Sequence, residues 1–323
     1  MKAAVIYQNS NLPQYTDHPE PVIQNDDELI MSVKAAAIKH IDKSRASGKH
    51  YSAGSESGPG TVPGGDGVGV LANGTRAYAI GVGGMMAERA LIDKTRMVLV
   101  PKALDDVTAA ALPNAVIGSA MALRFRGEMQ AGDTVLINGA TGFTGKVAVQ
   151  IAKHYGAKKI IATGRNEETL QSLLALGADE VISLKQDDTS LTAHIKALHG
   201  HSPINVIVDY LWGSTAQIIL AALKGKGNFT ARTRFVSVGS VSGDLIELSA
   251  ANLRSVDLQL SGSGLGSWTK PQVQQLFTHI LPEMFHLAAS GLLKVDTIEM
   301  NIKDISSLWD KQLPDGKRLV VTI

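Results

Sequence analysis

The stretch TVLINGATGFTGKVAVQIAKHYGA, residues 134–157, joins an apolar, strand-like run to a glycine-rich turn and then to an amphipathic helix. Ala140, Gly142 and Gly145 occupy the three positions of a G-x-G-x-x-G pattern, with alanine in place of the first glycine. A glycine at 142 lets the backbone approach a pyrophosphate, a glycine at 145 lets the helix pack closely, and the helix N-terminus offers N–H groups to the anion. In this strand–turn–helix context the pattern predicts a dinucleotide-binding turn rather than an ordinary one.

The surrounding sequence predicts an α/β domain from residue 124 to about 264. Apolar runs alternate there with stretches of helical periodicity. The expected strands are residues 133–138, 158–163, 179–184, 205–210, 234–239 and 257–262. Because such apolar strands are buried on both faces, we expect a parallel sheet covered by helices, the doubly wound Rossmann arrangement.

The two ends of the chain predict a second domain. Residues 1 to about 123 contain short β segments separated by Pro, Gly, Asn and Asp, which indicates a compact all-β unit. The expected strands are residues 1–7, 28–38, 67–72, 75–80, 87–92 and 97–101. The tail, 265–323, has one long helix pattern at 273–291 and a strand-like end at 318–323 that can return to complete this domain. The expected domains are therefore 1–123 with 265–323, and 124–264.

Composition excludes several classes of function. The chain has 323 residues, 44% of them apolar and 19% charged, which is typical of a globular chain of two domains. Lys plus Arg is 31 and Asp plus Glu is 30, so no charge excess favours nucleic acid or an anionic membrane as a partner. Cysteine is absent, which excludes disulfides, thiolate catalysis and sulfur-ligated zinc. With no signal peptide and no apolar run of ~18 residues, we expect a soluble, cytoplasmic protein.

The residues after the second strand indicate which dinucleotide is bound. An NAD site usually places an acid there to hold the ribose 2′-hydroxyl. This chain instead has Gly164, Arg165 and Asn166, and its acids, Glu167 and Glu168, fit the first turn of the next helix. Arg165 offers a planar cation to a 2′-phosphate, although an arginine here can also be a solvated surface charge. The pattern favours NADP(H).

The chain resembles the medium-chain dehydrogenase/reductase superfamily, in its zinc-independent quinone oxidoreductase-like branch. The resemblance covers nearly the whole length. It rests on MKAAVIY (1–7), AAAIKHIDKSRASGKHY (35–51), VPGGDGVGV (62–70), GGMMAERALI (83–92), AALPNAVIGSAMAL (110–123), LGADEVI (176–182), NVIVDY (205–210), FVSVGS (235–240) and GKRLVV (316–321), together with the glycine turn. It implies a GroES-like β-barrel domain, built from both chain ends, around a central Rossmann domain, and by analogy a homodimer formed through the region 256–266.

The resemblance also implies site residues. The cofactor-binding set is Thr141, Gly142, Phe143, Thr144, Gly164, Arg165, Asn166, Leu211, Val238, Gly239 and Ser240. The catalytic candidates are Lys39 and Tyr51, where Tyr51 would donate a proton or hydrogen bond to the substrate oxygen. The branch commonly carries Asn in place of Lys39 and Thr in place of Gly118, so the family's usual substrate does not transfer directly.

We expect no catalytic metal. Zinc members of the superfamily place a cysteine on the segment matching Ala37–Asp42 and a His-Glu pair where this chain has Gly65 and Asp66. His40 alone does not make a zinc site.

These features together predict an enzyme, an NADPH-dependent, metal-independent reductase that passes hydride to a quinone or an α,β-unsaturated carbonyl compound. The alternatives are an enoyl-thioester reductase of the same superfamily and a non-enzymatic NADPH-binding protein with a structural or regulatory role. A further alternative is an atypical short-chain dehydrogenase that uses the Tyr-x-x-x-Lys spacing of Tyr155 and Lys159. That pair ends the helix after the glycines, which makes this alternative the weakest.

Overall fold

The computed structural model describes residues 1–7, 10, 12–47 and 60–323. It divides into two compact units, Met1–Asn114 with Gln275–Ile323 and Ala115–Gln274. One unit contains both ends of the chain and the other contains its middle. The boundaries lie at 114/115 and 274/275, so the first of them falls within a single continuous helix, α2 (Asp106–Met121).

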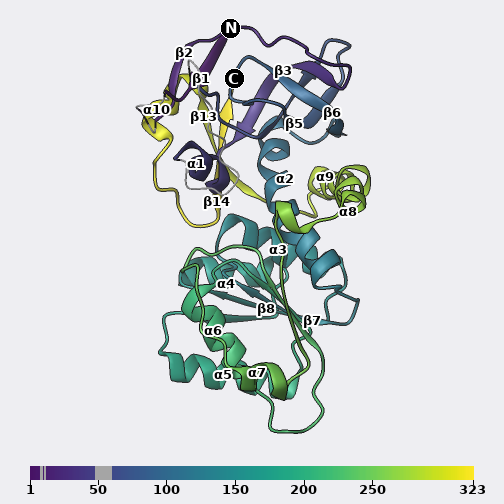
Figure 1. Ribbon diagram of the computed structural model, residues 1–323, viewed down its shortest axis with the longest axis vertical. Helices are drawn as coiled ribbons and strands as arrows, with labels where there is room; N and C mark the ends of the chain where they lie inside the picture. The colour runs from purple at the N-terminus through teal and green to yellow at the C-terminus, as the bar shows by residue number, and fades with distance from the viewer. Residues whose placement is uncertain (8–9, 11, 48–59) are drawn as a thin grey trace. The chain divides into compact units, whose positions relative to one another are not determined.

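The middle unit contains a parallel six-stranded sheet (Figure 1) with the order β12-β11-β10-β7-β8-β9. Its strands are β7 (Thr134–Asn138), β8 (Lys159–Gly164), β9 (Glu180–Ser183), β10 (Val206–Asp209), β11 (Thr233–Ser237) and β12 (Leu258–Gly262). Its helices are η1 (Ala122–Arg126), α3 (Phe143–His154), α4 (Glu167–Ala175), α5 (Asp188–His201), α6 (Gly213–Ala222), α7 (Ala250–Ser255), η2 (Leu265–Ser267) and α8 (Lys270–Gln275). All six predicted strands and the Rossmann fold class are confirmed.

Apolar strands and capped helices explain this unit locally. Every residue of β7, with the sequence TVLIN, is buried, as expected for a central strand covered on both faces. Asn166 caps α4 by accepting a hydrogen bond from the Thr169 N–H at 2.9 Å. One apolar cluster joins the sheet to α5 and α6 through residues such as Leu136, Ile195 and Ile219.

The strand order places a topological switch point between β7 and β10. From β7 the chain moves outward through β8 and β9, and then returns to β10 on the other side of β7. Both pairings are parallel, with Ile137 opposite Ala162 and Asn138 opposite Asp209. In open sheets of this kind, ligands bind beyond the carboxyl ends of the strands at the switch point.

The other unit contains a six-stranded sheet with the order β13-β14-β3-β4-β5-β6, and β3 also pairs with β6. This extra pairing gives the sheet its barrel-like form. The strands of the unit are β1 (Lys2–Val5), β2 (Gln14–Asp17), β3 (Glu28–Ala37), β4 (Asp66–Leu71), β5 (Arg76–Gly81), β6 (Arg89–Leu99), β13 (Asp296–Asn301) and β14 (Lys317–Thr322). Its helices are α1 (His40–Ala46), η3 (Leu276–Ile280), α9 (Leu281–Ala289), η4 (Ile302–Asp304) and α10 (Ile305–Leu308), with the first part of α2. The expected return of the tail is confirmed, because β14 pairs antiparallel with β3.

The barrel-like unit differs from the sequence prediction in several elements: β2 and β13 were not predicted, and two predicted strands and one predicted helix have a different form. The predicted strands 87–92 and 97–101 are one strand, β6, whose first half pairs with β3 and whose last residues pair with β5. The predicted helix 273–291 consists of α8, η3 and α9. Its middle turn is π-helical, directly before Pro282, which has no N–H to continue the ordinary ladder.

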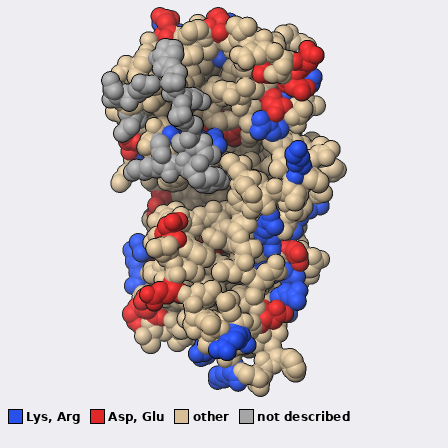
Figure 2. Space-filling view, viewed as in Figure 1, with Lys and Arg blue, Asp and Glu red and all other residues tan. Residues whose placement is uncertain are grey.

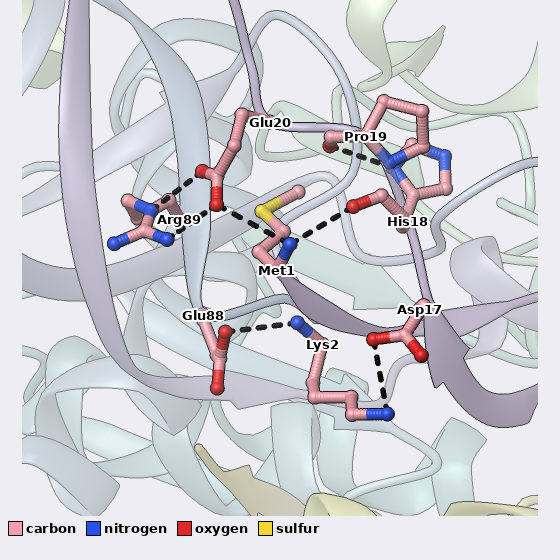
Figure 3. Close-up of polar contacts among 8 residues, drawn as sticks. All are labelled: Met1, Lys2, Asp17, His18, Pro19, Glu20, Glu88 and Arg89. Atoms are coloured by element: carbon pink, nitrogen blue, oxygen red, sulfur yellow. Dashed lines mark hydrogen bonds and ion pairs between the residues drawn. The ribbon is translucent and has the colours of Figure 1, made fainter.

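Ion pairs and a hydrogen bond join the N-terminus, the β1–β2 hairpin and Glu20 to Glu88 and Arg89 at the start of β6 (Figure 3). The Met1 ammonium lies 3.2 Å from a carboxylate oxygen of Glu20, whose other oxygen accepts from Arg89 Nε at 2.7 Å. The Lys2 N–H donates to Glu88 at 2.8 Å, and its ammonium pairs with Asp17 at 3.0 Å. These mostly exposed pairs fix the hairpin's orientation more than they add stability.

The surface carries charges of both signs, and one helix is strongly apolar. On the face drawn in Figure 2, basic and acidic side chains are interspersed, with broad uncharged areas between them. Among the described residues, one helix, Asp106–Arg126, is long and apolar enough to cross a membrane, and 67% of its apolar window is buried inside the structure. Core helices give the same signal.

Candidate functional site

The glycine turn has the geometry that close approach requires. Gly139 has φ +85°, a conformation that favours glycine. A Cβ built on Gly145 would lie 2.5 Å from Ala140 Cα, so this position admits only glycine while α3 packs on the turn. A Cβ on Gly142 would meet, among the described residues, one atom within 4 Å, the Gly139 carbonyl oxygen at 3.8 Å. Gly142 therefore faces open space, whereas Gly145 is required for packing.

The second strand ends beside this turn. A Cβ on Gly164 would lie 2.3 Å from Thr141 Cγ2, which places the two turns in direct contact. Arg165 is exposed, and Asn166 is the cap of α4. Glu167 and Glu168 lie in the first turn of α4, as the sequence predicted, and not at the end of the strand.

The remaining predicted cofactor residues lie at the carboxyl ends of β10 and β11 or at the start of α3. The Leu211 side chain comes within 2.8 Å of the position that a Cβ on Gly139 would take. Val238 N–H donates to the Asp209 carbonyl at 2.8 Å, and Gly239 follows it. Ser240 is exposed, and Phe143 and Thr144 form the first turn of α3. The structure thus gathers the predicted set along one edge of the sheet.

Three buried polar residues at this edge were not predicted. Asn138 and Asp209 are the last residues of β7 and β10, Thr163 is the last but one of β8, and each side chain is fully buried. Thr163 Oγ1 donates to Asn138 Oδ1 at 2.6 Å, and Asn138 Nδ2 donates to Asp209 Oδ1 at 2.7 Å. Burial raises the pKa of Asp209, although the N–H donors that bond it act in the opposite direction. The available signal was a polar residue at the end, or next to the end, of each of three strands with an apolar centre.

The structure explains why position 118 is glycine. A Cβ on Gly118 would lie 3.2 Å from Thr144 Cγ2 and 4.0 Å from the Tyr210 ring. The Tyr210 hydroxyl donates to the Gly118 carbonyl at 3.1 Å and lies 3.0 Å from Ser119 Oγ. Tyr210 and Thr144 therefore take part of the space that a threonine side chain at 118 would need.

Lys39 is enclosed in an ion network within the barrel-like unit. Its ammonium contacts the Asp66 carboxylate, lies 3.3 Å from Asp42 Oδ2 and donates to the Ala37 carbonyl at 3.1 Å. The other Asp66 oxygen accepts from the Tyr78 hydroxyl at 2.7 Å. Lys39, Asp42 and Asp66 are 3%, 4% and 6% exposed, so the network is closed to water.

Burial and neighbouring charge act in opposite directions on this network. Burial lowers the pKa of Lys39, but the Asp42 and Asp66 carboxylates outweigh it and raise that pKa above its ordinary value. Burial and the Asp66 charge raise the pKa of Tyr78 well above 10. A second buried cation, Arg318, has its pKa lowered by burial to about 10, with Asp42 and Asp66 opposing the shift. Lys39 is therefore a charged, enclosed group, while Tyr51 lies outside the described residues.

The donor set near Lys39 does not fit zinc. Asp42 and Asp66 already share an ammonium ion, the chain has no sulfur ligand, and His40 is exposed. Within residues 1–7, 10, 12–47 and 60–323, no three His, Asp or Glu side chains are grouped to hold a metal. The metal-independence of the protein stays a prediction.

The structure argues against the short-chain dehydrogenase alternative. Tyr155 ends α3, and Lys159 begins β8, where it pairs with Glu180 at 2.7 Å. Lys159 therefore lies at the amino ends of the strands, the edge opposite the glycine turn. A Tyr–Lys pair at that edge does not face a nicotinamide bound at the carboxyl ends.

Comparison with known proteins agrees with this geometry. The family model described as zinc-binding dehydrogenase matches residues 144–281, a range without cysteine. A probable NADPH-dependent quinone reductase from Emericella nidulans is 27% identical, with 97% of each chain covered. The NADPH-dependent alkenal/one oxidoreductase of Arabidopsis thaliana chloroplasts is 32% identical over 50% of this chain and 46% of its own. The crystal structure of Escherichia coli quinone oxidoreductase complexed with NADPH covers 100% of both chains at 22% identity, with a TM-score of 0.82.

At 22% identity the structural likeness shows the fold, and the similarity to the fungal relative extends over 97% of each chain. Both the Rossmann sheet with its glycine turn and the barrel-like unit built from the two chain ends are those expected from the resemblance. The chain therefore has the fold expected of the medium-chain dehydrogenase/reductase superfamily and is similar in sequence to quinone oxidoreductase-like proteins.

Proposed function

We propose that this protein is an NADPH-dependent, metal-independent reductase that transfers hydride to a quinone or an α,β-unsaturated carbonyl compound. The observation that carries the proposal is the glycine turn at the switch point, with Gly142 open to solvent and exposed Arg165 ending the neighbouring strand. The names of the fungal and plant relatives, which specify NADPH with quinone and alkenal substrates, support it.

The residues at the carboxyl edge fit a bound dinucleotide phosphate. The turn from Thr141 to Thr144 would hold the pyrophosphate, because Gly142 leaves its backbone accessible and starts a twelve-residue helix, α3. Arg165 would pair with the 2′-phosphate, and Gly164 and Asn166 hold the backbone on either side of it. Leu211 and the Val238–Ser240 segment would line the rest of the crevice.

When bound, NADPH supplies the hydride, and the protein supplies position and electrostatics. Lys39 acts in this proposal as a positioning residue, because its ammonium is enclosed by Asp42 and Asp66 and does not reach solvent. Tyr51 is kept as the proposed donor to the developing oxyanion. Since no metal polarises the carbonyl, the acceptor must be activated by conjugation, which ranks simple alcohol oxidation lower.

Turnover of NADPH against quinones, enones and enoyl thioesters tests the proposal directly. Activity on quinones or enones is the expected result. Activity confined to enoyl thioesters would establish the alternative substrate class, and tight NADPH binding without turnover of any acceptor would establish a binding protein. Tyr51→Phe should lower kcat and leave the Kd for NADPH unchanged if Tyr51 is the donor.

The proposed reductase is a homodimer, with the β12 region as its contact. β12 is an edge strand of the sheet, and Leu260 on it is 37% exposed. Sedimentation analysis of the protein and of a Leu260→Lys variant tests this. A single monomeric species in the unsubstituted protein would contradict it.

A further inference from the structure

A buried amide and a buried carboxylate bridge the switch point of the sheet. Asn138 is the last residue of β7 and Asp209 the last of β10, and the two are register partners. Both side chains are 0% exposed. The 2.7 Å hydrogen bond from Asn138 Nδ2 to Asp209 Oδ1 therefore joins the two strand ends between which a dinucleotide is expected to lie.

Asp209 also holds the turn that follows β10. Its carboxylate accepts from the backbone N–H groups of Leu211 and Trp212, each at 3.0 Å. Trp212 has φ +55° and ψ −153°, a backbone conformation that is normally confined to glycine. Residues held there cost free energy and persist only where the surroundings fix them. The carboxylate supplies that restraint.

Asn138 likewise holds the glycine turn. Its Oδ1 accepts from Thr163 Oγ1, and the same Thr163 oxygen accepts from the Gly139 N–H at 3.2 Å. The Leu211 side chain packs against Gly139, where a Cβ would come within 2.8 Å of it. The turn after β7 and the turn after β10 are therefore joined twice, once by hydrogen bonds and once by packing.

We propose that Asn138 and Asp209 are positioning residues, which hold the turns 139–142 and 211–213 in the conformation that binds the dinucleotide. The inference rests on the proposed function. Position 138 needs a group that accepts on one side, from Thr163, and donates on the other, to Asp209. An amide does both, whereas a carboxylate can only accept when ionised. The site therefore requires an amide at position 138, and replacing Asn138 should change dinucleotide binding.

Asn138→Asp tests this requirement. At pH 7.5 the new carboxylate faces Asp209 with no proton to donate, so we expect the Kd for NADP⁺ to rise about 10- to 100-fold, as for loss of a hydrogen bond to a charged group. Two interacting carboxyls titrate as a pair, and one of them gains a proton as the pH falls. The protonated pair restores the donor, so at pH 5.5 the affinity should return to within about threefold of the unsubstituted protein at the same pH.

The neighbours of the pair make the pH series interpretable. Among the described residues, the groups bonded to the two side chains are the hydroxyls of Thr163 and Thr215 and the N–H groups of Leu211 and Trp212, none of which titrates in this range. The matched control is Asn205→Asp, at the opposite edge of the sheet. Asn205 Oδ1 accepts from the Thr134 N–H at 2.9 Å, a bond that a carboxylate keeps, so the control should bind NADP⁺ like the unsubstituted protein at both pH values.

Calorimetric titration with NADP⁺, together with a melting curve for each variant, decides between outcomes. Folded Asn138→Asp protein that binds normally at pH 7.5 overturns the inference, as does weak binding that does not recover at pH 5.5. If Asn138→Asp does not fold at pH 7.5, Thr163→Val replaces it. That variant removes only the hydroxyl that orients the amide, and it should raise Kd about 3- to 30-fold. Unchanged affinity would again overturn the inference, whereas failure of the unsubstituted protein to bind NADP⁺ would overturn the proposed function.

Discussion

Replacement of Lys39 by methionine should destabilise the barrel-like unit strongly. The ammonium is the cation that Asp42 and Asp66 share, and all three side chains are less than a tenth exposed. Removing it leaves two carboxylates buried with less compensating charge. Breaking a buried pair in this way typically costs about 3–5 kcal/mol. Since domains are commonly stable by about 5–15 kcal/mol, the variant should fold but lose a large fraction of its free energy of unfolding.

The assay should read the barrel-like unit by itself, because two units need not unfold together. Hydrogen exchange of peptides from β4 and β5 in a urea series does so. Lys94→Met is the control: its ammonium pairs with Asp27 at 3.1 Å but is 42% exposed, so a loss below about 1 kcal/mol is expected. Lys39→Met with Asp66→Asn should recover part of the loss. If Lys39→Met costs no more than Lys94→Met, the network contributes nothing and the reasoning fails.

Four further outcomes are expected. The Gly142→Val variant should have a normal melting temperature but lose NADP⁺ binding in calorimetry, and normal binding would count against the site. The Gly145→Ala variant should have a lower melting temperature, because its Cβ would overlap the turn. Arg165→Ala should weaken NADPH binding about 10- to 150-fold and leave NADH binding almost unchanged. The control Arg232→Ala should change neither affinity, and an equal loss of affinity for both cofactors in Arg165→Ala would show that Arg165 has a structural role. Burial raises the pKa of Tyr78 above the ordinary 10.0, so its contribution to stability is complete below pH 10 and declines at higher pH, when the unfolded chain ionises first. Tyr78→Phe should therefore reduce the alkaline slope of the unfolding free energy by up to about 1.4 kcal/mol per pH unit, and an unchanged slope would refute this. Dialysis against a chelator should leave melting temperature and turnover unchanged, a result that stoichiometric, activity-dependent zinc would contradict.

The Rossmann half of the fold was clear from the sequence, because its central strands contain apolar runs, such as VLI in β7 and VIV in β10, and the glycine turn has a steric requirement at fixed spacing. Gly145 illustrates this: the 2.5 Å contact that a side chain would make leaves one residue type. The strands β2 and β13 were not predicted, since QYTD and DTIEMN are mostly polar and exposed and lack an apolar period. β6 was predicted as two strands because a continuous strand that changes partner is exposed in its middle.

The polar parts of the site were harder to predict for a different reason. Asn138, Thr163 and Asp209 are ordinary residues in the sequence, and their relation depends on the order of strands in the sheet. Lys39 was identified as a departure from the family's pattern, but the partners that enclose it come from α1 and β4. Their approach depends on tertiary packing, which spacing along the chain does not reveal.

The pairing of β14 with β3 has a consequence for how the molecule is made. Ala37 on β3 is the register partner of Val320 on β14, and nearly the whole chain separates the two in sequence. The pairing on that side of β3 can therefore form only after β14 has been synthesised. During synthesis the Rossmann unit is complete before β14 is made, and until then β3 has an unpaired strand edge on that side. Nascent chains stalled before residue 317 should therefore engage chaperones through the β3 region, and release should follow once the final strand leaves the exit tunnel.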